Sequence, residues 1–370
     1  MAMIESACSQ APFAESITAA IPPSCRTRPA AAEPERVLVG ELALGRFRIL
    51  DQLGSGGMGT VYRARDERLG REVAVKEVAG AVGPRAGREA KAAARLNHPC
   101  VATLYELAAE GERTILVSEL ARGRPLGELL AAGELTDREV GEVGLDVAAA
   151  LAHAHSRGVV HRDVKPANLV VDLDSTPIRA KLLDFGIAAL ADEPRLTASG
   201  EVVGTLAYMA PEQADGFDAG PEADAYSLAL TLYECWSGSN PIAAETPAAT
   251  ARRIGAPVPP LARERPDLPL PVTQAVDAGL APDPVARPPL EDLIAALEHE
   301  LGALDAETLL EPTHQNVASP ARPRRVAWLV PALPLALTPV LGARALALAV
   351  ICALVAVAGS GVRRLGEAAR

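Results

Sequence analysis

Three residues within one short stretch carry the functional groups that a phosphate-handling site needs. Residues 161–168 read His-Arg-Asp-Val-Lys-Pro-Ala-Asn and follow an apolar run. The carboxylate of Asp163 can position a hydroxyl nucleophile, and Lys165 can neutralise a phosphate. The side chain of Asn168 can bind a metal ion through its amide oxygen. This spacing indicates a catalytic loop that brings together a hydroxyl, a phosphate and a cation.

Three glycines are spaced for the close approach of a phosphate. Gly54, Gly56 and Gly59 lie between two strand-like segments. Because glycine has no Cβ, backbone N–H groups there can approach phosphate oxygens. In dinucleotide-binding folds a helix follows such glycines, but here residues 61–65 alternate like a strand. The pattern therefore predicts a glycine-rich hairpin that covers a bound nucleotide.

A cation and a carboxylate farther along the chain would complete this phosphate site. Lys76 lies in the next predicted strand, residues 72–78, and would bind the α- and β-phosphates. Glu89 lies on a predicted helix, residues 88–96, and would pair with Lys76. Arginine supplies most of the 36 basic residues, so lysine at position 76 indicates a site that needs a compact charge.

The elements that position these residues fall into two blocks. Strands are predicted over residues 47–50, 61–65, 72–78, 101–107 and 114–119. Ala121-Arg122-Gly123 then forms a hinge, and helices are predicted over 126–130 and 137–157. The fold class is therefore α+β, with a sheet in front of a helical part.

Composition excludes several classes of protein. The chain has 370 residues, and its formal net charge of 36 − 47 = −11 argues against a protein that coats nucleic acid. The five cysteines are scattered and odd in number, so neither a disulfide framework nor a zinc site is expected. This usage indicates a reduced, cytosolic location for the bulk of the chain.

Residues 47–304 taken together resemble the bacterial eukaryotic-like (Hanks-type) serine/threonine protein kinases. The resemblance rests on motifs in one fixed order: the glycine hairpin, Val73-Ala74-Val75-Lys76, the Glu89 helix, His161-Arg162-Asp163, Asp184-Phe185-Gly186 and Ala210-Pro211-Glu212. It implies a two-lobed protein kinase fold. A five-stranded antiparallel sheet with one helix would form the N-lobe, residues 47–120, above a mainly helical C-lobe, residues 121–304. ATP would bind between the lobes with Mg²⁺, or alternatively Mn²⁺.

The resemblance also implies a role for individual residues. Asp163 would orient or accept the proton of the substrate hydroxyl, while Lys165 would neutralise the γ-phosphoryl group, with Lys76 and Glu89 completing the catalytic set. Asn168 and Asp184 would hold the metal ions. The nucleotide would contact Leu53, Gly54, Gly56, Gly59, Val61, Ala74, Lys76, Glu119, Ala121 and Val170.

Regulation is expected through the activation segment. Arg162 would bind a phosphate carried by Thr197 or Ser199, where related kinases are autophosphorylated. Glu212 is expected to pair with Arg287. The small side chain of Ala93 is expected to weaken the active position of the Glu89 helix.

Both ends of the chain are expected to lie outside the kinase domain. Residues 1–40 are rich in Ala, Pro and Ser and predict a disordered tail. Residues 305–325 predict a polar linker. Residues 326–362 predict a transmembrane hairpin with both ends cytoplasmic, and a single span over 345–362 is the alternative.

These expectations define the partners and the alternatives. The predicted protein is a membrane-tethered kinase at the bacterial cell membrane, with a cytoplasmic kinase domain and with protein substrates that offer Ser or Thr hydroxyls. A homodimer that activates the kinase is left open, and no nucleic-acid partner is expected. The main alternative is a pseudokinase-type nucleotide-binding scaffold, and a kinase for small molecules is a second.

Overall fold

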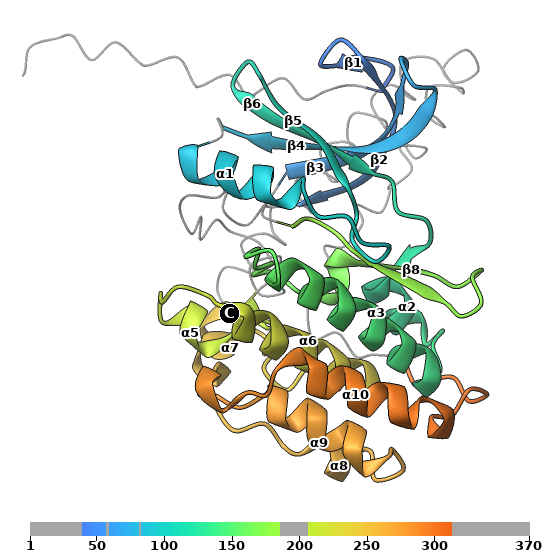
Figure 1. The fold of residues 1–370 in the computed structure, drawn as a ribbon, viewed down its shortest axis with the longest axis vertical. Coiled ribbons are helices and arrows are strands. Elements are labelled where there is room, and N and C mark those ends of the chain that lie inside the picture. The colour runs from blue at the N-terminus through green and yellow to red at the C-terminus, as the bar shows by residue number, and fades with distance from the viewer. Residues whose placement is uncertain (1–38, 57–58, 81–82, 186–205, 313–370) are drawn as a thin grey trace, which may run out of the picture.

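A computed structural model describes residues 39–56, 59–80, 83–185 and 206–312. A sheet with one helix lies above a larger group of helices (Figure 1). The upper lobe contains β1 (Leu42–Ala43), β2 (Phe47–Gly56), β3 (Gly59–Asp66), β4 (Arg71–Ala79), α1 (Pro84–Ala93), β5 (Leu104–Glu110) and β6 (Arg113–Glu119).

The upper sheet is antiparallel, with the strand order β1-β2-β3-β4-β6-β5. It has six strands, one more than expected, because the short strand β1 pairs with the start of β2. Alternate residues of β4 face a small core: Val73 and Val75 are buried together with Phe47, Ile115 and Val117. Ala74 and Lys76 therefore point to the opposite face of the sheet, toward the lower lobe.

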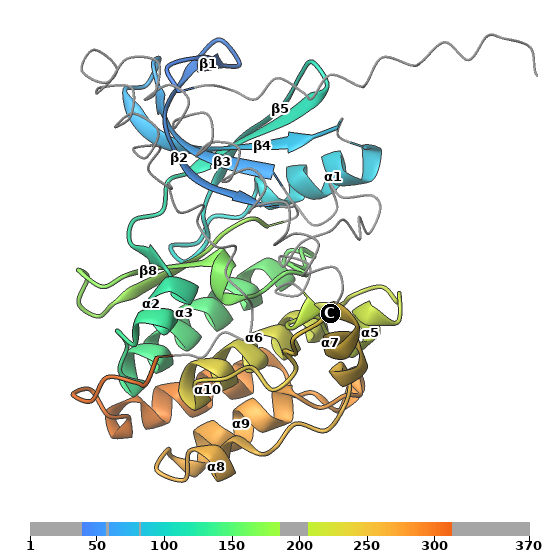
Figure 2. The same cartoon turned by 180° about the vertical axis from the view of Figure 1, so that it is seen from behind.

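The lower lobe is helical. It contains β7 (Arg124–Pro125), α2 (Leu126–Ala132), α3 (Asp137–His155), η1 (Pro166–Asn168), β8 (Leu169–Asp172), β9 (Arg179–Leu182), α5 (Pro211–Ala214), α6 (Pro221–Ser237), α7 (Pro247–Arg253), α8 (Leu261–Glu264), α9 (Leu270–Gly279), η3 (Pro284–Ala286), α10 (Leu290–Glu300) and η4 (Leu301–Ala303). The view from behind shows α6 crossing the middle of this lobe (Figure 2). Nearly all of α6 is buried, because its side chains are mostly apolar or small on every face.

The connection between the lobes requires a glycine. Gly123 has φ +109°, and a Cβ placed there would lie 2.0 Å from the carbonyl oxygen of Val171 on β8. The chain thus leaves β6 and passes directly against the small sheet formed by β7, β8 and β9. The expected hinge at 121–123 lies at this point.

The first residues of the expected linker pack on the helical lobe. The Leu310 N–H donates to the Leu135 carbonyl at 2.7 Å, and the Arg138 N–H donates to the Asp305 carbonyl at 2.9 Å. Residues 305–312 therefore run beside the turn between α2 and α3. The expected N-terminal tail (apart from Val39 and Gly40) and the apolar segments at 326–362 lie outside the described residues.

The expected pair of Glu212 and Arg287 is confirmed. The Arg287 guanidinium donates two hydrogen bonds to the Glu212 carboxylate, at 2.7 and 2.8 Å, and further ones to backbone carbonyls. The Arg287 side chain is completely buried. Burial alone would raise the pKa of Glu212, but the hydrogen bonds from Arg287 outweigh it and the pKa is lowered.

Replacing Arg287 by Ala is expected to lower the free energy of unfolding by about 3 kcal/mol at pH 7, because it leaves a largely buried carboxylate without its cation. Since the pKa of Glu212 is lower in the folded than in the unfolded state, the pair stabilises the fold above the unfolded pKa and loses this effect as the pH falls through the folded pKa. In urea unfolding, the difference in free energy of unfolding between wild type and Arg287→Ala should therefore become smaller below about pH 4. If the deficit does not depend on pH, the pair is not its source.

Candidate functional site

The loop that carries Asp163 is anchored to α6 by one buried carboxylate. Asp224, whose side chain is completely buried, accepts hydrogen bonds from the backbone N–H groups of His161 at 2.8 Å and Arg162 at 2.7 Å. Its carboxylate also lies 2.7 Å from Nε2 of His155 on α3. Arg162 has a left-handed backbone, φ +68°, and these contacts hold that strained conformation.

Asp224 was not among the candidate site residues predicted from the sequence. One available signal was an acidic residue near the start of a helix that is rich in apolar side chains, since buried carboxylates need hydrogen-bond partners. His161 was likewise part of the motif without a role of its own. In the structure its Nε2 lies 2.7 Å from the Leu183 carbonyl oxygen, and its ring packs edge-on against Phe185 at 4.6 Å. It thus connects the catalytic loop to the segment that carries Asp184.

Asp163, Lys165 and Asn168 form one hydrogen-bonded cluster. Nζ of Lys165 lies 2.8 Å from Oδ2 of Asp163. The Asn168 amide nitrogen donates to that same carboxylate oxygen at 2.9 Å and to the Asp163 carbonyl at 2.7 Å. The short helix η1 between Lys165 and Leu169 folds the chain back so that Asn168 reaches Asp163. The three groups expected to act together therefore lie together.

Asp184 and Lys76 meet across the gap between the lobes. Nζ of Lys76 lies 2.5 Å from Oδ2 of Asp184. Asp184 follows β9 and has a left-handed backbone, φ +62°. The adjoining Leu183 N–H donates to the Asn168 carbonyl at 2.9 Å, so Asp184 lies next to the catalytic cluster.

Glu89 does not pair with Lys76 in this structure, contrary to expectation. Its carboxylate instead accepts a hydrogen bond from the Arg162 guanidinium at 2.9 Å. Lys76 is bound to Asp184, and Arg162 offers Glu89 a planar group with several donors. Ala93, four residues after Glu89, is buried with a small side chain. The expected partners are thus exchanged: Lys76 with Asp184, and Glu89 with Arg162.

The hairpin between β2 and β3 contains the three glycines. Gly56 is paired with Gly59 at its end, and Gly54 is paired with Val61. Gly59 has φ +117°, and a Cβ there would lie 2.0 Å from the Glu77 carbonyl oxygen on β4. Gly54 has no such contact, since a Cβ there would meet nothing within 4 Å. Gly59 is therefore required by the fold, whereas Gly54 is free of that constraint.

Replacing Gly59 by Ala is expected to lower the free energy of unfolding by about 1–3 kcal/mol, because the hairpin must shift away from β4 or keep a strained backbone. Gly54→Ala is the matched control and should change this free energy by less than the Gly59 variant does. Urea unfolding of both variants measures the difference. Equal losses would show that the contact with Glu77 does not constrain the hairpin.

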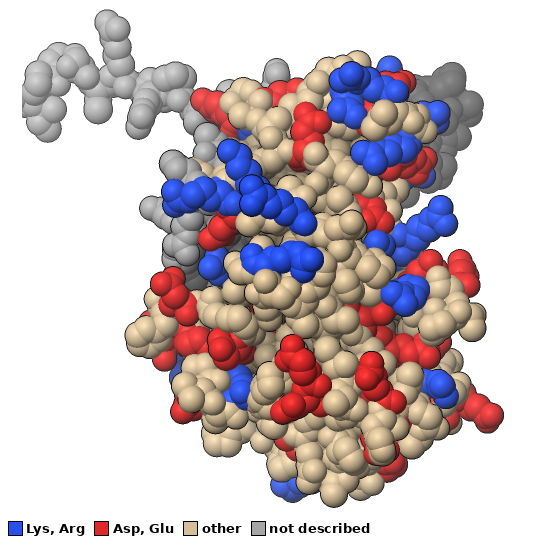
Figure 3. Space-filling model, in the orientation of Figure 1, with Lys and Arg blue, Asp and Glu red and all other residues tan. Residues whose placement is uncertain are grey.

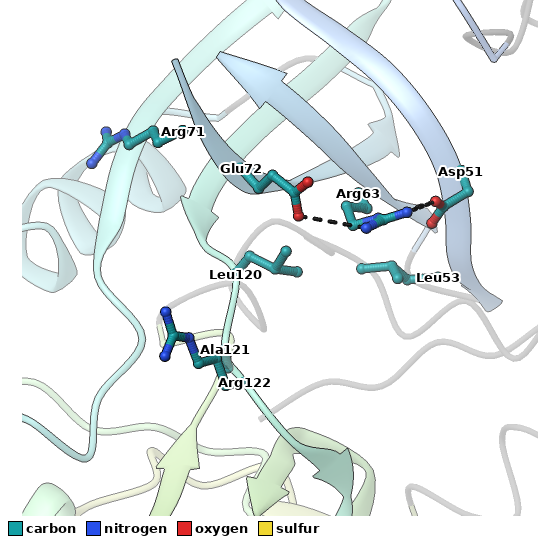
Figure 4. A pocket seen from close by; sticks show the side chains of 8 residues that line it. All are labelled: Asp51, Leu53, Arg63, Arg71, Glu72, Leu120, Ala121 and Arg122. Atoms are coloured by element: carbon teal, nitrogen blue, oxygen red, sulfur yellow. Dashed lines mark hydrogen bonds and ion pairs between the residues drawn. The ribbon is translucent and has the colours of Figure 1, made fainter. Parts of the chain in front are cut away.

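A cavity of about 750 Å³ opens beside the hinge. Figure 4 shows Leu53 of β2, Leu120 just before the hinge and Ala121 of the hinge around it. Two of these, Leu53 and Ala121, are expected nucleotide contacts. The charged residues of the lining were not predicted. Among them, Arg63 lies between Asp51 and Glu72 and forms ion pairs with them at 2.5 and 3.5 Å.

The other expected nucleotide contacts lie on strands that border the gap between the two lobes. Val61 is paired with Lys76 across β3 and β4, and Ala74 is paired with Ser118 across β4 and β6. Val170 is on β8, beneath the hinge. Glu119 ends β6, and its carboxylate is 2.9 Å from Nζ of Lys181, a contact that the sequence did not predict.

The oxygen ligands present fit a hard divalent cation. Asn168 uses its amide nitrogen for both hydrogen bonds to Asp163, which leaves its amide oxygen directed elsewhere. Asp184 adds a carboxylate from the neighbouring segment. A carboxylate and an amide oxygen are ligands that Mg²⁺ accepts, usually together with phosphate oxygens and water. No cluster of three or more His, Cys, Asp or Glu ligands occurs within the part of the chain that the structure describes.

The chain after residue 205 is fixed to α6. The Tyr208 hydroxyl donates to the Glu234 carboxylate, and Ser227 donates to the Tyr208 carbonyl at 2.8 Å. Burial raises the pKa of the Glu234 carboxyl, an effect that the hydrogen bonds from Tyr208 and Asn240 only partly offset. The expected phosphorylation sites Thr197 and Ser199 and the glycine of the Asp184 motif, Gly186, lie outside the described residues.

Comparison with known proteins gives consistent results. A model of the protein kinase domain matches residues 47–296. The chain is 39% identical over 277 residues to serine/threonine-protein kinase PknA of Mycobacterium tuberculosis, a match that covers 70% of this chain and 63% of PknA. It is 34% identical over 284 residues to serine/threonine-protein kinase PrkC of Bacillus subtilis, covering 74% of this chain and 43% of PrkC. The chain thus spans less than two-thirds of the length of these relatives.

Among solved structures, the kinase domain of Mycobacterium tuberculosis PknI matches with a TM-score of 0.58 and 28% identity, covering 72% of this chain and 100% of that domain. The family match extends over more than half of the chain, and the site motifs lie within it in the expected order. The chain therefore belongs to the protein kinase family, and within it to the bacterial eukaryotic-like serine/threonine kinases.

Proposed function

We propose that this protein transfers the γ-phosphoryl group of ATP to Ser and Thr hydroxyls of proteins, itself included. The observation that carries the proposal is the convergence of charged and amide groups from separate segments. The catalytic loop brings Asp163, Lys165 and Asn168 together. Asp184 and Lys76 meet beside them, one from each lobe.

Asp163 would act on the substrate hydroxyl. Its carboxylate is held by Asn168 and Lys165, so one orientation is favoured before the substrate binds. In that position it would accept or orient the hydroxyl proton as the oxygen attacks phosphorus. Lys165, 2.8 Å away, would balance the charge that spreads over the phosphoryl oxygens in a loose transition state.

Lys76 would bind the α- and β-phosphates, under the hairpin that carries Gly54, Gly56 and Gly59. Asn168 and Asp184 would hold Mg²⁺, which when bound supplies positive charge to the β- and γ-phosphates. Because Lys76 now lies 2.5 Å from Asp184, nucleotide and metal binding requires these two side chains to separate. The adenine would lie beside Leu53 and Ala121 at the edge of the cavity.

The exchange of ion pairs supports regulation through Arg162. Glu89 occupies the guanidinium that a phosphate on Thr197 or Ser199 would bind. A phosphate with two negative charges offers a stronger bidentate partner than a carboxylate does. Phosphorylation would therefore release Glu89 to bind Lys76, and Lys76 would leave Asp184 to the metal ion.

Attachment to a membrane is proposed from the sequence alone. Residues 326–362 are apolar enough for a hairpin, with a single span over 345–362 as the alternative. Within the ranges that the structure describes, no helix is both long and apolar enough to cross a bilayer. A kinase held at the bacterial cell membrane, with its catalytic domain in the cytoplasm, is the arrangement that these segments favour.

The test is autophosphorylation of the full chain in nonionic detergent with Mg-ATP, with sites mapped by mass spectrometry. Phosphate on Thr197 or Ser199 that disappears when EDTA removes the divalent ion is the expected result, and Mn²⁺ is added back in a parallel sample. ATP binding without any phosphate transfer to the chain or to a generic protein substrate would instead favour a nucleotide-binding scaffold.

A further inference from the structure

The backbone of Arg162, directly before the carboxylate of Asp163, is strained. Its φ of +68° lies in the left-handed region, which a non-glycine residue occupies only where its surroundings hold it there. Asp224 binds the N–H group of Arg162 and so fixes the peptide group on one side of this residue. The peptide group on the other side, which joins Arg162 to Asp163, needs partners of its own.

Both polar atoms of that second peptide group have a partner. The Asp163 N–H donates to Nδ1 of His161 at 3.2 Å. The Arg162 carbonyl oxygen accepts a hydrogen bond from Nε2 of Gln213 at 3.1 Å. His161 belongs to the catalytic loop itself, whereas Gln213 lies on α5, after the Ala210-Pro211-Glu212 motif. Gln213 therefore links this peptide group to a separate element of the lower lobe.

The two ends of the Gln213 amide have different tasks. Its Oε1 accepts a hydrogen bond from the Ala210 N–H at 3.2 Å, which caps the start of α5, while Nε2 donates to the catalytic loop. Because an N–H group only donates and a carbonyl oxygen only accepts, these partners fix the orientation of the amide. Capping α5 needs only the oxygen. The donor is therefore the part of Gln213 that acts on the catalytic loop.

The segment that carries Gln213 is itself held in place. The Ala207 carbonyl, in a buried residue, accepts a hydrogen bond from the Asn240 amide at 3.2 Å. Glu212, next to Gln213, is bound by two hydrogen bonds from the completely buried side chain of Arg287. A side chain that projects from such a fixed support can hold a neighbouring loop in one conformation.

We propose that Gln213 is a positioning residue for the carboxylate of Asp163, because it keeps the peptide group between Arg162 and Asp163 from turning over. This inference rests on the proposed function, in which Asp163 acts on the hydroxyl. A peptide group is a rigid plane that turns about the two single bonds beside it. Turning would separate the Asp163 N–H from His161 and change the direction in which the Asp163 side chain leaves the backbone. A displacement of about 1 Å can reduce a reaction rate about 100-fold.

The test compares Gln213→Glu with Gln213→Met in the full chain, in nonionic detergent. Glu keeps an oxygen that accepts from the Ala210 N–H, but its carboxylate cannot donate to the Arg162 carbonyl, and Met can do neither. For a positioning residue, kcat for a Ser/Thr peptide should fall at least about tenfold in both variants, while KM for ATP stays within about twofold of wild type. If Gln213 only capped α5, Gln213→Glu would behave like wild type and only Gln213→Met would be impaired.

Hydrogen–deuterium exchange of the peptide that covers residues 161–168 measures the catalytic loop without any catalysis. Exchange should be faster in Gln213→Glu than in wild type, because the loop opens more often once the Arg162 carbonyl has lost its donor. Unchanged exchange together with unchanged kcat would overturn the inference and leave the proposed function intact. Faster exchange with a wild type that transfers no phosphate would overturn the proposed function and support only the restraint on the loop.

The matched control is Ala214→Glu, which adds the same charge at the exposed neighbouring position of α5. Asp and Glu side chains already lie at many places on the helical lobe (Figure 3), so one more exposed carboxylate there should change neither kcat nor exchange. If Ala214→Glu lowers kcat as much as Gln213→Glu does while Gln213→Met leaves it unchanged, the added charge is the cause and the inference is wrong.

Discussion

Replacing Asp163 by Asn is expected to reduce kcat for phosphoryl transfer by at least about 100-fold. The amide cannot accept the hydroxyl proton, and it no longer provides the negative charge that holds Lys165 at 2.8 Å. The carboxylate contributes to the transition state in which the hydroxyl attacks and not to the binding of ATP. The affinity for ATP should therefore change little. Initial rates on a Ser/Thr peptide and the dissociation constant of ATP measure the two effects.

The control for this prediction is Asp174→Asn, in the exposed turn between β8 and β9. It removes one carboxylate from the same lobe but should leave kcat unchanged. The Asp163 variant should also unfold at the same urea concentration as wild type, because Asn can still accept the hydrogen bond from Asn168. A kcat within a few-fold of wild type would show that Asp163 does not act on the hydroxyl.

Replacing Asp184 by Asn is expected to reduce kcat/KM for Mg-ATP by at least about 100-fold. The variant loses a carboxylate ligand of the metal ion, and the remaining amide oxygens bind a divalent cation more weakly. The rate should therefore rise more steeply with Mg²⁺ concentration than in wild type. Titrating Mg²⁺ at fixed ATP measures this change.

The same substitution should not weaken the binding of ATP in the absence of metal, because it frees Lys76. This difference distinguishes a metal ligand from a merely structural residue. Without the carboxylate at 2.5 Å, Lys76 loses its present partner. Binding of metal-free ATP, measured by fluorescence titration in EDTA, should therefore be as tight as in wild type or tighter. Weaker binding in EDTA would show that Asp184 supports the nucleotide pocket itself and not the metal.

Much of the fold followed from local sequence patterns. Residues 72–78 were predicted to form a strand, and they lie in β4, where Val73 and Val75 are buried. The helices expected over 126–130 and 137–157 are α2 and α3, which span Leu126–Ala132 and Asp137–His155. The additional strand β1 was missed because two residues are too short to show a period of two.

The motifs predicted which candidate residues would lie near one another, but not all of the contacts that these residues make. The motifs placed Asp163, Lys165 and Asn168 within one short loop, where proximity is nearly guaranteed by sequence distance. Lys76 and Glu89 come from separate elements, so their pairing depends on how α1 packs on the sheet and the lower lobe. A side chain with two reachable partners takes the one that the tertiary packing favours, and here Glu89 binds Arg162. No local pattern carries that information.

The buried carboxylate of Asp224 has a consequence for how related genes are interpreted. Inactive members of an enzyme family are usually recognised by loss of the residues that touch the reactants. Here the peptide groups of His161 and Arg162 depend on a side chain that lies on α6 and touches no reactant. A relative could keep the counterparts of Lys76, Asp163, Asn168 and Asp184 but lack the counterpart of Asp224. It would then be classified as active, although its catalytic loop would lack the anchor.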